Sequence, residues 1–130
     1  MKLTFVNPRD VHAPVGPYTH TAVVPAGTEL VFVAGQVGMR VDGTVPATFA
    51  EQAELTFANL RACLAAHGLG VEAVVKLTVF VVPPQDFAVL RAVREKHFGS
   101  HRPTSTTVYV PALAAPALML EVEAVAAKGA

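Results

Sequence analysis

The sequence predicts one α+β domain of 130 residues, in which two helices cover one face of a sheet. Valine-rich runs typical of strands alternate with two amphipathic segments typical of helices. Prolines lie between these runs, as expected for turns. No linker, repeat or low-complexity tract interrupts the chain, so residues 1–130 are expected to form a single domain.

The N-terminal half is predicted to contain two strands and a helix. The strands cover about residues 19–24 and 29–34, and the segment Pro25-Ala26-Gly27 between them is typical of a turn. The helix is expected to begin at Thr48, because Thr48 and Glu51 have the spacing of a capping box. Its buried stripe is Ala53, Phe57, Leu60 and Leu64, with Gly68 as the left-handed end.

The C-terminal half is predicted to contain three strands and a second helix. The run at residues 73–82 is rich in valine and stops at a double proline, which indicates a strand. Asp86 has the position of an N-cap, Gly99 that of a helix end, and Phe87, Leu90 and Phe98 share one helical face. Residues 104–110 and 118–126 are the last two strands.

Side-chain alternation along these strands predicts two unlike sheet faces. One face is aliphatic and suits the helices: Val75, Leu77, Val79, Val81, Leu118, Leu120, Val122 and Ala124. The other is expected to carry Lys76, Ser105, Thr107, Glu121 and Glu123. No helix is left to cover this second face, so it is predicted to pack against another subunit.

Composition excludes several classes of protein. Hydrophobic residues make up 52% of the chain and charged residues 15%, which is too apolar for a disordered protein. The formal net charge of zero disfavours nucleic acid and anionic membrane as partners. The lone Cys63, the lack of a signal-peptide core and the lack of a run of ~20 apolar residues predict a cytoplasmic protein.

Six segments together resemble the RidA/YjgF family of reactive intermediate deaminases, which is also called endoribonuclease L-PSP-like. They are GPYTH (16–20), VFVAGQV (31–37), AELTFANLRACLAAHG (53–68), VVKLTVFVV followed by DFAVLRAVREKHF (74–98), RPTSTTVYVPAL (102–113) and LEVEAVA (120–126). The resemblance implies a chorismate-mutase-like α+β fold with a mixed sheet and two helices on one of its faces. It also implies a homotrimer around a barrel, with three clefts between subunits.

Deaminases of this family hydrolyse 2-imino acids, and an arginine in a Pro-Ala-Arg-Ser segment holds the substrate carboxylate. The matching segment here is Pro103-Thr104-Ser105-Thr106, so Ser105 stands in the place of the arginine. A hydroxyl is a neutral donor where a bidentate, charge-assisted pair is needed. Classical 2-imino acid deamination is therefore expected to be weakened or absent, at a cost of about 2–5 kcal/mol in binding.

The resemblance also implies the site residues. Glu121 matches the water-positioning glutamate and is the predicted catalytic residue. Tyr18 matches the tyrosine of a Gly-Pro-Tyr motif, while Ala34 and Thr107 stand where the family has serine and cysteine. Tyr18, Ala34, Ser105 and Thr107 are thus expected to bind substrate. The alternatives are an ordinary ion pair between Glu121 and Lys76, and structural roles for Tyr18, Ser105 and Thr107.

Other polar residues are expected to be structural. Arg102 is interpreted as a solvated loop residue, and Arg91 and Arg94 as residues on the solvent face of the second helix. His20 shares strand parity with Tyr18 and could approach the cleft. His97 and His101 are four residues apart, but Gly99 breaks the helix between them, so no metal site is expected.

These observations predict a hydrolase that acts in clefts between subunits. Its expected substrate is a reactive imine, enamine or related small metabolite without a carboxylate that needs an arginine to hold it. No cofactor is expected, since the sequence has no phosphate loop or dinucleotide fingerprint. The alternative is a trimer of the same fold that binds a small molecule, or serves as a scaffold, without catalysis. A ribonuclease, an activity attributed to some relatives, is disfavoured because the chain has no basic stripe.

Overall fold

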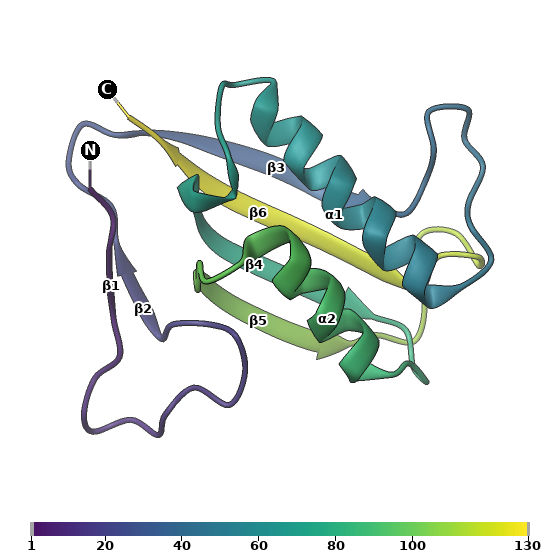
Figure 1. Cartoon of the computed structure of the whole chain (residues 1–130), viewed down its shortest axis with the longest axis horizontal. Coiled ribbons are helices and arrows are strands. Elements are labelled where there is room, and N and C mark those ends of the chain that lie inside the picture. The colour runs from purple at the N-terminus through teal and green to yellow at the C-terminus, as the bar shows by residue number, and fades with distance from the viewer. Residues whose placement is uncertain (1, 130) are drawn as a thin grey trace.

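The computed structural model describes residues 2–129. Its main sheet contains β3 (Glu29–Val37), β6 (Leu120–Lys128), β4 (Val74–Val81) and β5 (Thr104–Tyr109), in the order β3-β6-β4-β5. β6 pairs antiparallel with both β3 and β4, whereas β4 and β5 are parallel. The predicted mixed sheet is confirmed (Figure 1).

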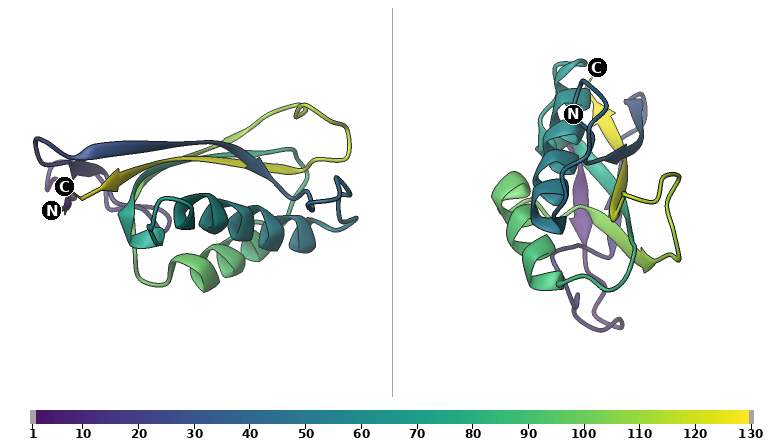
Figure 2. Two further views of the ribbon diagram at one scale, coloured as in Figure 1. Left: turned by 90° about the horizontal axis from the view of Figure 1, so that it is seen from above. Right: turned by 90° about the vertical axis from the view of Figure 1, so that its right-hand side faces the viewer.

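Both helices lie on one side of this sheet. They are α1 (Phe49–Ala65) and α2 (Phe87–Phe98), and a short 3-10 turn, η1 (Val71–Ala73), precedes β4. Figure 2 shows the sheet from its edge, with both helices beneath it and its other face uncovered. The core between the layers holds the predicted aliphatic side chains except Val75, among them the fully buried Phe57, Leu60, Leu64, Leu77, Leu120 and Val122. Val75 is only half-buried, because a register irregularity between Val74 and Lys76 places Val74 in the core instead.

The predicted helix ends are confirmed. The Thr48 hydroxyl accepts a hydrogen bond from the backbone N–H of Glu51 (3.2 Å), and the Asp86 carboxylate accepts one from the first turn of α2 (2.9 Å). Gly68 and Gly99 follow the two helices with φ of 72° and 57°, the left-handed region that favours glycine.

The N-terminal region differs from the prediction. β2 (Thr21–Val23) is shorter than expected and pairs with β1 (Thr4–Val6), which was not predicted, in a separate two-stranded sheet. β3 is longer than expected and continues to Val37. A three-residue strand has too few positions for side-chain alternation to identify it, so its pairing partner could not be found from the sequence.

Glu54 on α1 contacts α2 through its carboxylate, 3.0 Å from Lys96 Nζ and 2.9 Å from His97 Nε2. The hydrogen bond from Lys96, followed by that of His97, holds the pKa of Glu54 below its usual 4.5. A carboxyl whose pKa is lower in the folded state than in the unfolded state stabilises the fold at pH values above the unfolded-state pKa. This stabilisation is lost as the pH falls through the folded-state pKa.

Because the side chain is 40% exposed, we expect E54Q to cost about 0.5–1 kcal/mol at neutral pH. The difference from the wild type should shrink as the pH falls through the lowered pKa of Glu54, because the wild-type carboxyl then becomes neutral as well. Urea unfolding of both proteins at neutral pH and at a series of acidic pH values measures this. An equal difference at every pH value would contradict the assignment.

Candidate functional site

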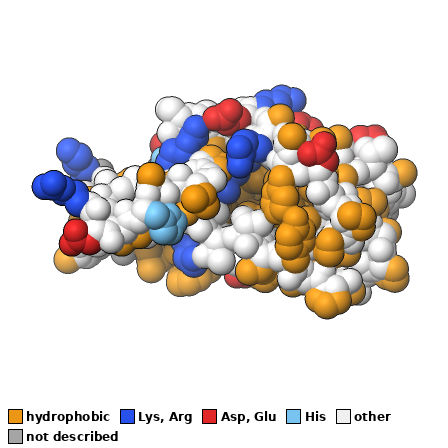
Figure 3. All heavy atoms as spheres, turned by 90° about the horizontal axis from the view of Figure 1, so that it is seen from below, with side chains coloured by type: hydrophobic (Ala, Val, Ile, Leu, Met, Phe, Trp, Pro, Cys, Tyr) orange, Lys and Arg blue, Asp and Glu red, His pale blue; other side chains and the backbone are white. Residues whose placement is uncertain are grey.

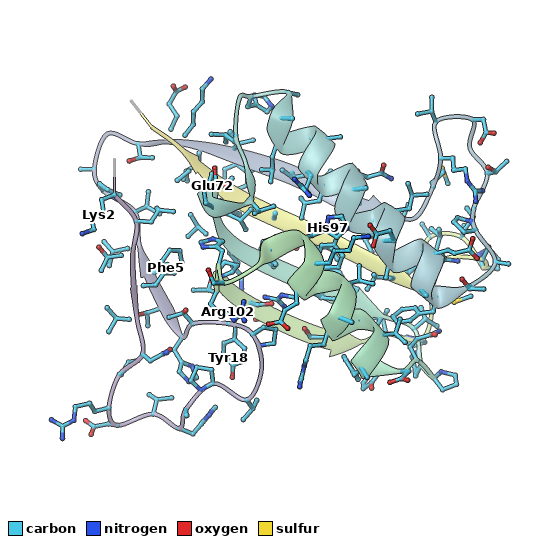
Figure 4. The ribbon with its side chains drawn as sticks, viewed as in Figure 1. Lys2, Phe5, Tyr18, Glu72, His97 and Arg102 are labelled. Carbon is cyan, nitrogen blue, oxygen red and sulfur yellow. The ribbon has the colours of Figure 1, made fainter. Side chains whose placement is uncertain are left out.

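A cleft of about 480 Å³ lies between the N-terminal loop, α2 and β5. It brings together three of the residues predicted to bind substrate, Tyr18, Ser105 and Thr107. Figure 4 shows Tyr18 on the N-terminal loop, near β5 and α2. Figure 3 shows this edge of the molecule, where hydrophobic side chains lie beside lysine and arginine side chains.

Ser105 and Thr107 lie on the helix-covered side of the sheet, which corrects the prediction that they share a face with Lys76 and Glu121. The parallel register of β4 and β5 pairs Ser105 with Leu77 and Thr107 with Val79, and both of these partners are buried under the helices. β5 is an edge strand without a buried apolar row, so alternation within the strand could not reveal which of its sides faces the helices.

The prediction for Arg94 is also wrong, because this residue is buried and only 7% exposed. Its Nη1 donates to Ser105 Oγ (3.1 Å) and its Nη2 to the Pro17 carbonyl (2.9 Å). A guanidinium from α2 therefore lies beside the hydroxyl that replaces the expected arginine. Arg94 is four residues from both Leu90 and Phe98, which are buried on the same helix face. That spacing is the sequence signal that could have placed Arg94 inward.

Burial of the guanidinium, with a smaller contribution from the charge of Arg102, lowers the pKa of Arg94 to about 10. Arg94 is therefore still a cation at neutral pH. Arg102 is not the solvated residue that was expected. Its Nη2 is 2.8 Å from Glu95 Oε1, and its Nη1 donates to the Gly99 carbonyl (2.6 Å). Arg102 thus ties the end of α2 to the segment before β5.

Tyr18 is held by the loop that carries it. The next residue, Thr19, is bound twice to the segment before β5: its backbone N–H donates to the Pro103 carbonyl (3.1 Å) and its hydroxyl to the Arg102 carbonyl (2.6 Å). The Tyr18 hydroxyl accepts a hydrogen bond from the Val15 N–H (3.3 Å). Its own proton is then available to a molecule in the cleft.

Glu121 lies on the uncovered face of the sheet, where the register pairs it with Phe80 of β4. Its carboxylate sits directly over Gly35, since a Cβ built at residue 35 would be 2.7 Å from Glu121 Cδ. The alternative of an ion pair with Lys76 has no support among residues 2–129. Lys76 Nζ lies 3.5 Å from Thr106 Oγ1 instead.

Ala34 also lies on the uncovered face, in a shallow hollow of about 460 Å³ with Phe32, Lys76 and Glu123. Phe32 is 74% exposed there. A single protomer therefore separates the predicted site residues into two groups. One group is Tyr18, Ser105 and Thr107 in the cleft, and the other is Ala34 and Glu121 across the sheet.

His97 and His101 make separate contacts. His97 binds Glu54, His101 Nε2 lies 2.8 Å from the Val74 carbonyl, and residues 2–129 contain no group of three side chains that could hold a metal ion. His20 does approach Tyr18, with the two rings edge to face at 5.4 Å, although neither residue is in a strand. Within this part of the chain, no helix is long and apolar enough to cross a membrane.

Comparison with known proteins gives a consistent set of relatives. The family model described as endoribonuclease L-PSP matches residues 9–128. TdcF of Escherichia coli K12, a candidate reactive intermediate deaminase, is 35% identical over 120 residues, which cover 89% of this chain and 90% of TdcF. The RutC family protein YjgH of the same organism is 35% identical over 98 residues, 75% of this chain and 74% of YjgH.

Two solved structures have the same fold. YyfB of Yersinia pestis, a Rid family protein of unknown function, has a TM-score of 0.86 at 26% identity, with 97% of this chain and 98% of YyfB covered. The structure of E. coli TdcF with bound serine has a TM-score of 0.72 at 32% identity, with 97% of this chain and 99% of that one covered.

Proposed function

Because this chain belongs to the endoribonuclease L-PSP family, also called the RidA/YjgF family, we propose that it hydrolyses the imine, or the tautomeric enamine, of a small reactive metabolite. The name of TdcF as a candidate reactive intermediate deaminase supports this chemistry, and the serine bound to TdcF supports a ligand of amino-acid size. The proposal includes a cytoplasmic location, in keeping with the single Cys63.

In the proposed reaction Glu121 acts on water. The substrate reacts as the protonated imine. The Glu121 carboxylate takes a proton from the water as the oxygen attacks the imine carbon, which gives a neutral carbinolamine. The Glu121 carboxyl then gives this proton to the nitrogen, and as the C–N bond breaks the hydroxyl proton passes to the leaving ammonia. Protonated imine and water thus become carbonyl compound and ammonium, and Glu121 is again a carboxylate.

The proposed site lies between copies of the chain in a homotrimer. Tyr18 and Ser105 line the cleft beside α2, whereas Glu121 lies across the sheet, so one protomer alone does not bring them together. A neighbouring copy that covers the open face would meet Glu121, Ala34 and the exposed Phe32. The number of three copies comes from the resemblance to the family.

The observation that carries the proposal is the Glu121 carboxylate, seated over Gly35 and without an ion-pair partner among residues 2–129. Imines can be generated in the cuvette by an amino-acid oxidase or an amine oxidase, and ammonia release measured above the uncatalysed rate. We expect E121Q to lower kcat/KM by about 10²–10⁴-fold, since the amide cannot accept the proton.

The matched control is E123Q, which changes the exposed carboxylate two residues further along the same face of β6. It should keep nearly full activity. Equal rates for E121Q and the wild type would contradict the role of Glu121. Ligand binding without turnover by the wild type would favour the alternative, a binding protein without catalysis.

A further inference from the structure

The cleft beside α2 contains a buried cation that no acid neutralises. Arg94 is 7% exposed, and among residues 2–129 no carboxylate lies within ion-pair distance of it. Its two hydrogen bonds go to neutral oxygens, those of Ser105 and Pro17. A buried charge without a counter-ion is costly to a fold, so its presence points to a role that requires the charge.

The residues around Arg94 make the cleft cationic. Arg91 also lines it and is exposed, and no aspartate or glutamate does. The next arginine, Arg102, is outside this lining and is neutralised by Glu95 at 2.8 Å. A molecule in the cleft therefore meets two positive charges and no negative one, which favours an anion.

The same cleft also offers neutral donors and an apolar wall. The two hydrogen bonds of Arg94 use two of the five N–H donors of a guanidinium. The Tyr18 and Ser105 hydroxyls lie on the same lining, while Val15, Phe87 and Leu90 supply apolar surface. Planar N–H donors beside hydroxyls match a carboxylate, and the apolar wall matches a short hydrocarbon chain.

We propose that this cleft binds a small carboxylate with an apolar chain, and that Arg94 is the cation that holds the carboxylate. The guanidinium comes from α2 and reaches the position of Ser105 from the side, so the charge that β5 itself lacks is supplied by the neighbouring helix. The inference names the ligand class of the proposed site and rests on the proposed function only for the reaction that follows binding.

The test is calorimetric titration of the full-length protein with 4-methylpentanoate and with its neutral amide, which has nearly the same shape. We expect the carboxylate to bind about 10- to 100-fold more tightly than the amide. R94M should abolish this preference. R94K should retain part of it, because the charge remains but the planar fork is lost.

The control is R61M, which removes an exposed arginine of α1 that does not line the cleft. It should keep the full preference, whereas R91M, which removes the exposed arginine of the cleft, should reduce the preference less than R94M does. Equal affinity for acid and amide, no measurable binding of either, or an effect of R61M or R91M as large as that of R94M would overturn the inference. If R94M fails to fold, the inference is tested by the carboxylate preference of the wild type and by the partial loss of that preference in R94K.

Neither ligand has a C=N bond, so the binding result does not depend on turnover. A carboxylate preference that depends on Arg94, found in a protein without imine hydrolysis, would uphold the inference and refute the proposed function. Imine hydrolysis that depends on Glu121, without any preference for the carboxylate, would support the proposed function and overturn the inference.

Discussion

Replacement of Gln52 by leucine is expected to lower the free energy of unfolding by about 3–5 kcal/mol. The Gln52 side chain is 1% exposed, and its Nε2 donates to the carbonyls of Pro46 (3.0 Å) and Ala117 (2.8 Å). Its Oε1 accepts the backbone N–H of Met119 at 2.9 Å. Leucine fills a similar volume but leaves all three backbone groups without a partner, and each costs about 1–3 kcal/mol when buried.

These three bonds join the first turn of α1 to the loops before it and before β6. The backbone has little room to shift and give these groups new partners, because Gly38 lies against the backbone of Gln52. A Cβ built at residue 38 would be 2.7 Å from Gln52 Cα. Urea unfolding followed by circular dichroism measures the loss. R61L, which introduces leucine at an exposed position of the same helix, should change stability by about 0.5 kcal/mol or less. A loss below about 1 kcal/mol for Q52L would mean that water replaces the lost partners.

The helices and the core could be predicted because their signals are local. The spacing of Ala53, Phe57, Leu60 and Leu64 placed α1 on the sheet, and all four side chains are fully buried. The polar stripe beside them was not predicted. Gln52 and Thr56 are as deeply buried. The Thr56 hydroxyl donates to the Gln52 carbonyl, and the partners of the Gln52 side chain lie six to 67 residues away in the sequence. Partners so far along the chain leave no local pattern that could predict this burial.

The candidate site was predicted only in part, because its arrangement depends on which strands are neighbours. Alternation along β6 placed Glu121 on the uncovered face correctly. The orientation of Ser105 depends on the parallel pairing of β5 with β4, and the sequence of β5 contains no signal that predicts this pairing. The prediction for Arg94 was wrong because it followed from the charge, which favours the solvent face, and not from the spacing to Leu90 and Phe98, which favours the buried face. Its aliphatic stem can pack among Leu90 and Phe98 while the guanidinium reaches polar atoms.

Replacement of Gly35 by alanine is expected to lower the turnover of imines by about 10²-fold or more, although residue 35 takes no part in the reaction. A Cβ at this position would lie within 2.7 Å of Glu121 Cδ and closer still to the carboxylate oxygen, so the carboxylate must move. A displacement of about 1 Å at a reacting group can cost 10²-fold in rate. The nearest atoms are the end of a flexible side chain, so the free energy of unfolding should change by only about 1 kcal/mol.

A double-mutant cycle tests whether this effect passes through Glu121. If Gly35 only leaves room for the carboxylate, G35A should reduce the rate in the wild-type background and have no further effect in E121Q. Equal losses in both backgrounds would mean that G35A damages the uncovered face in another way, and sedimentation of the variant would reveal whether assembly has changed. Full activity of G35A would mean that Glu121 can do its work from another rotamer, and that its seat over Gly35 is not the reacting position.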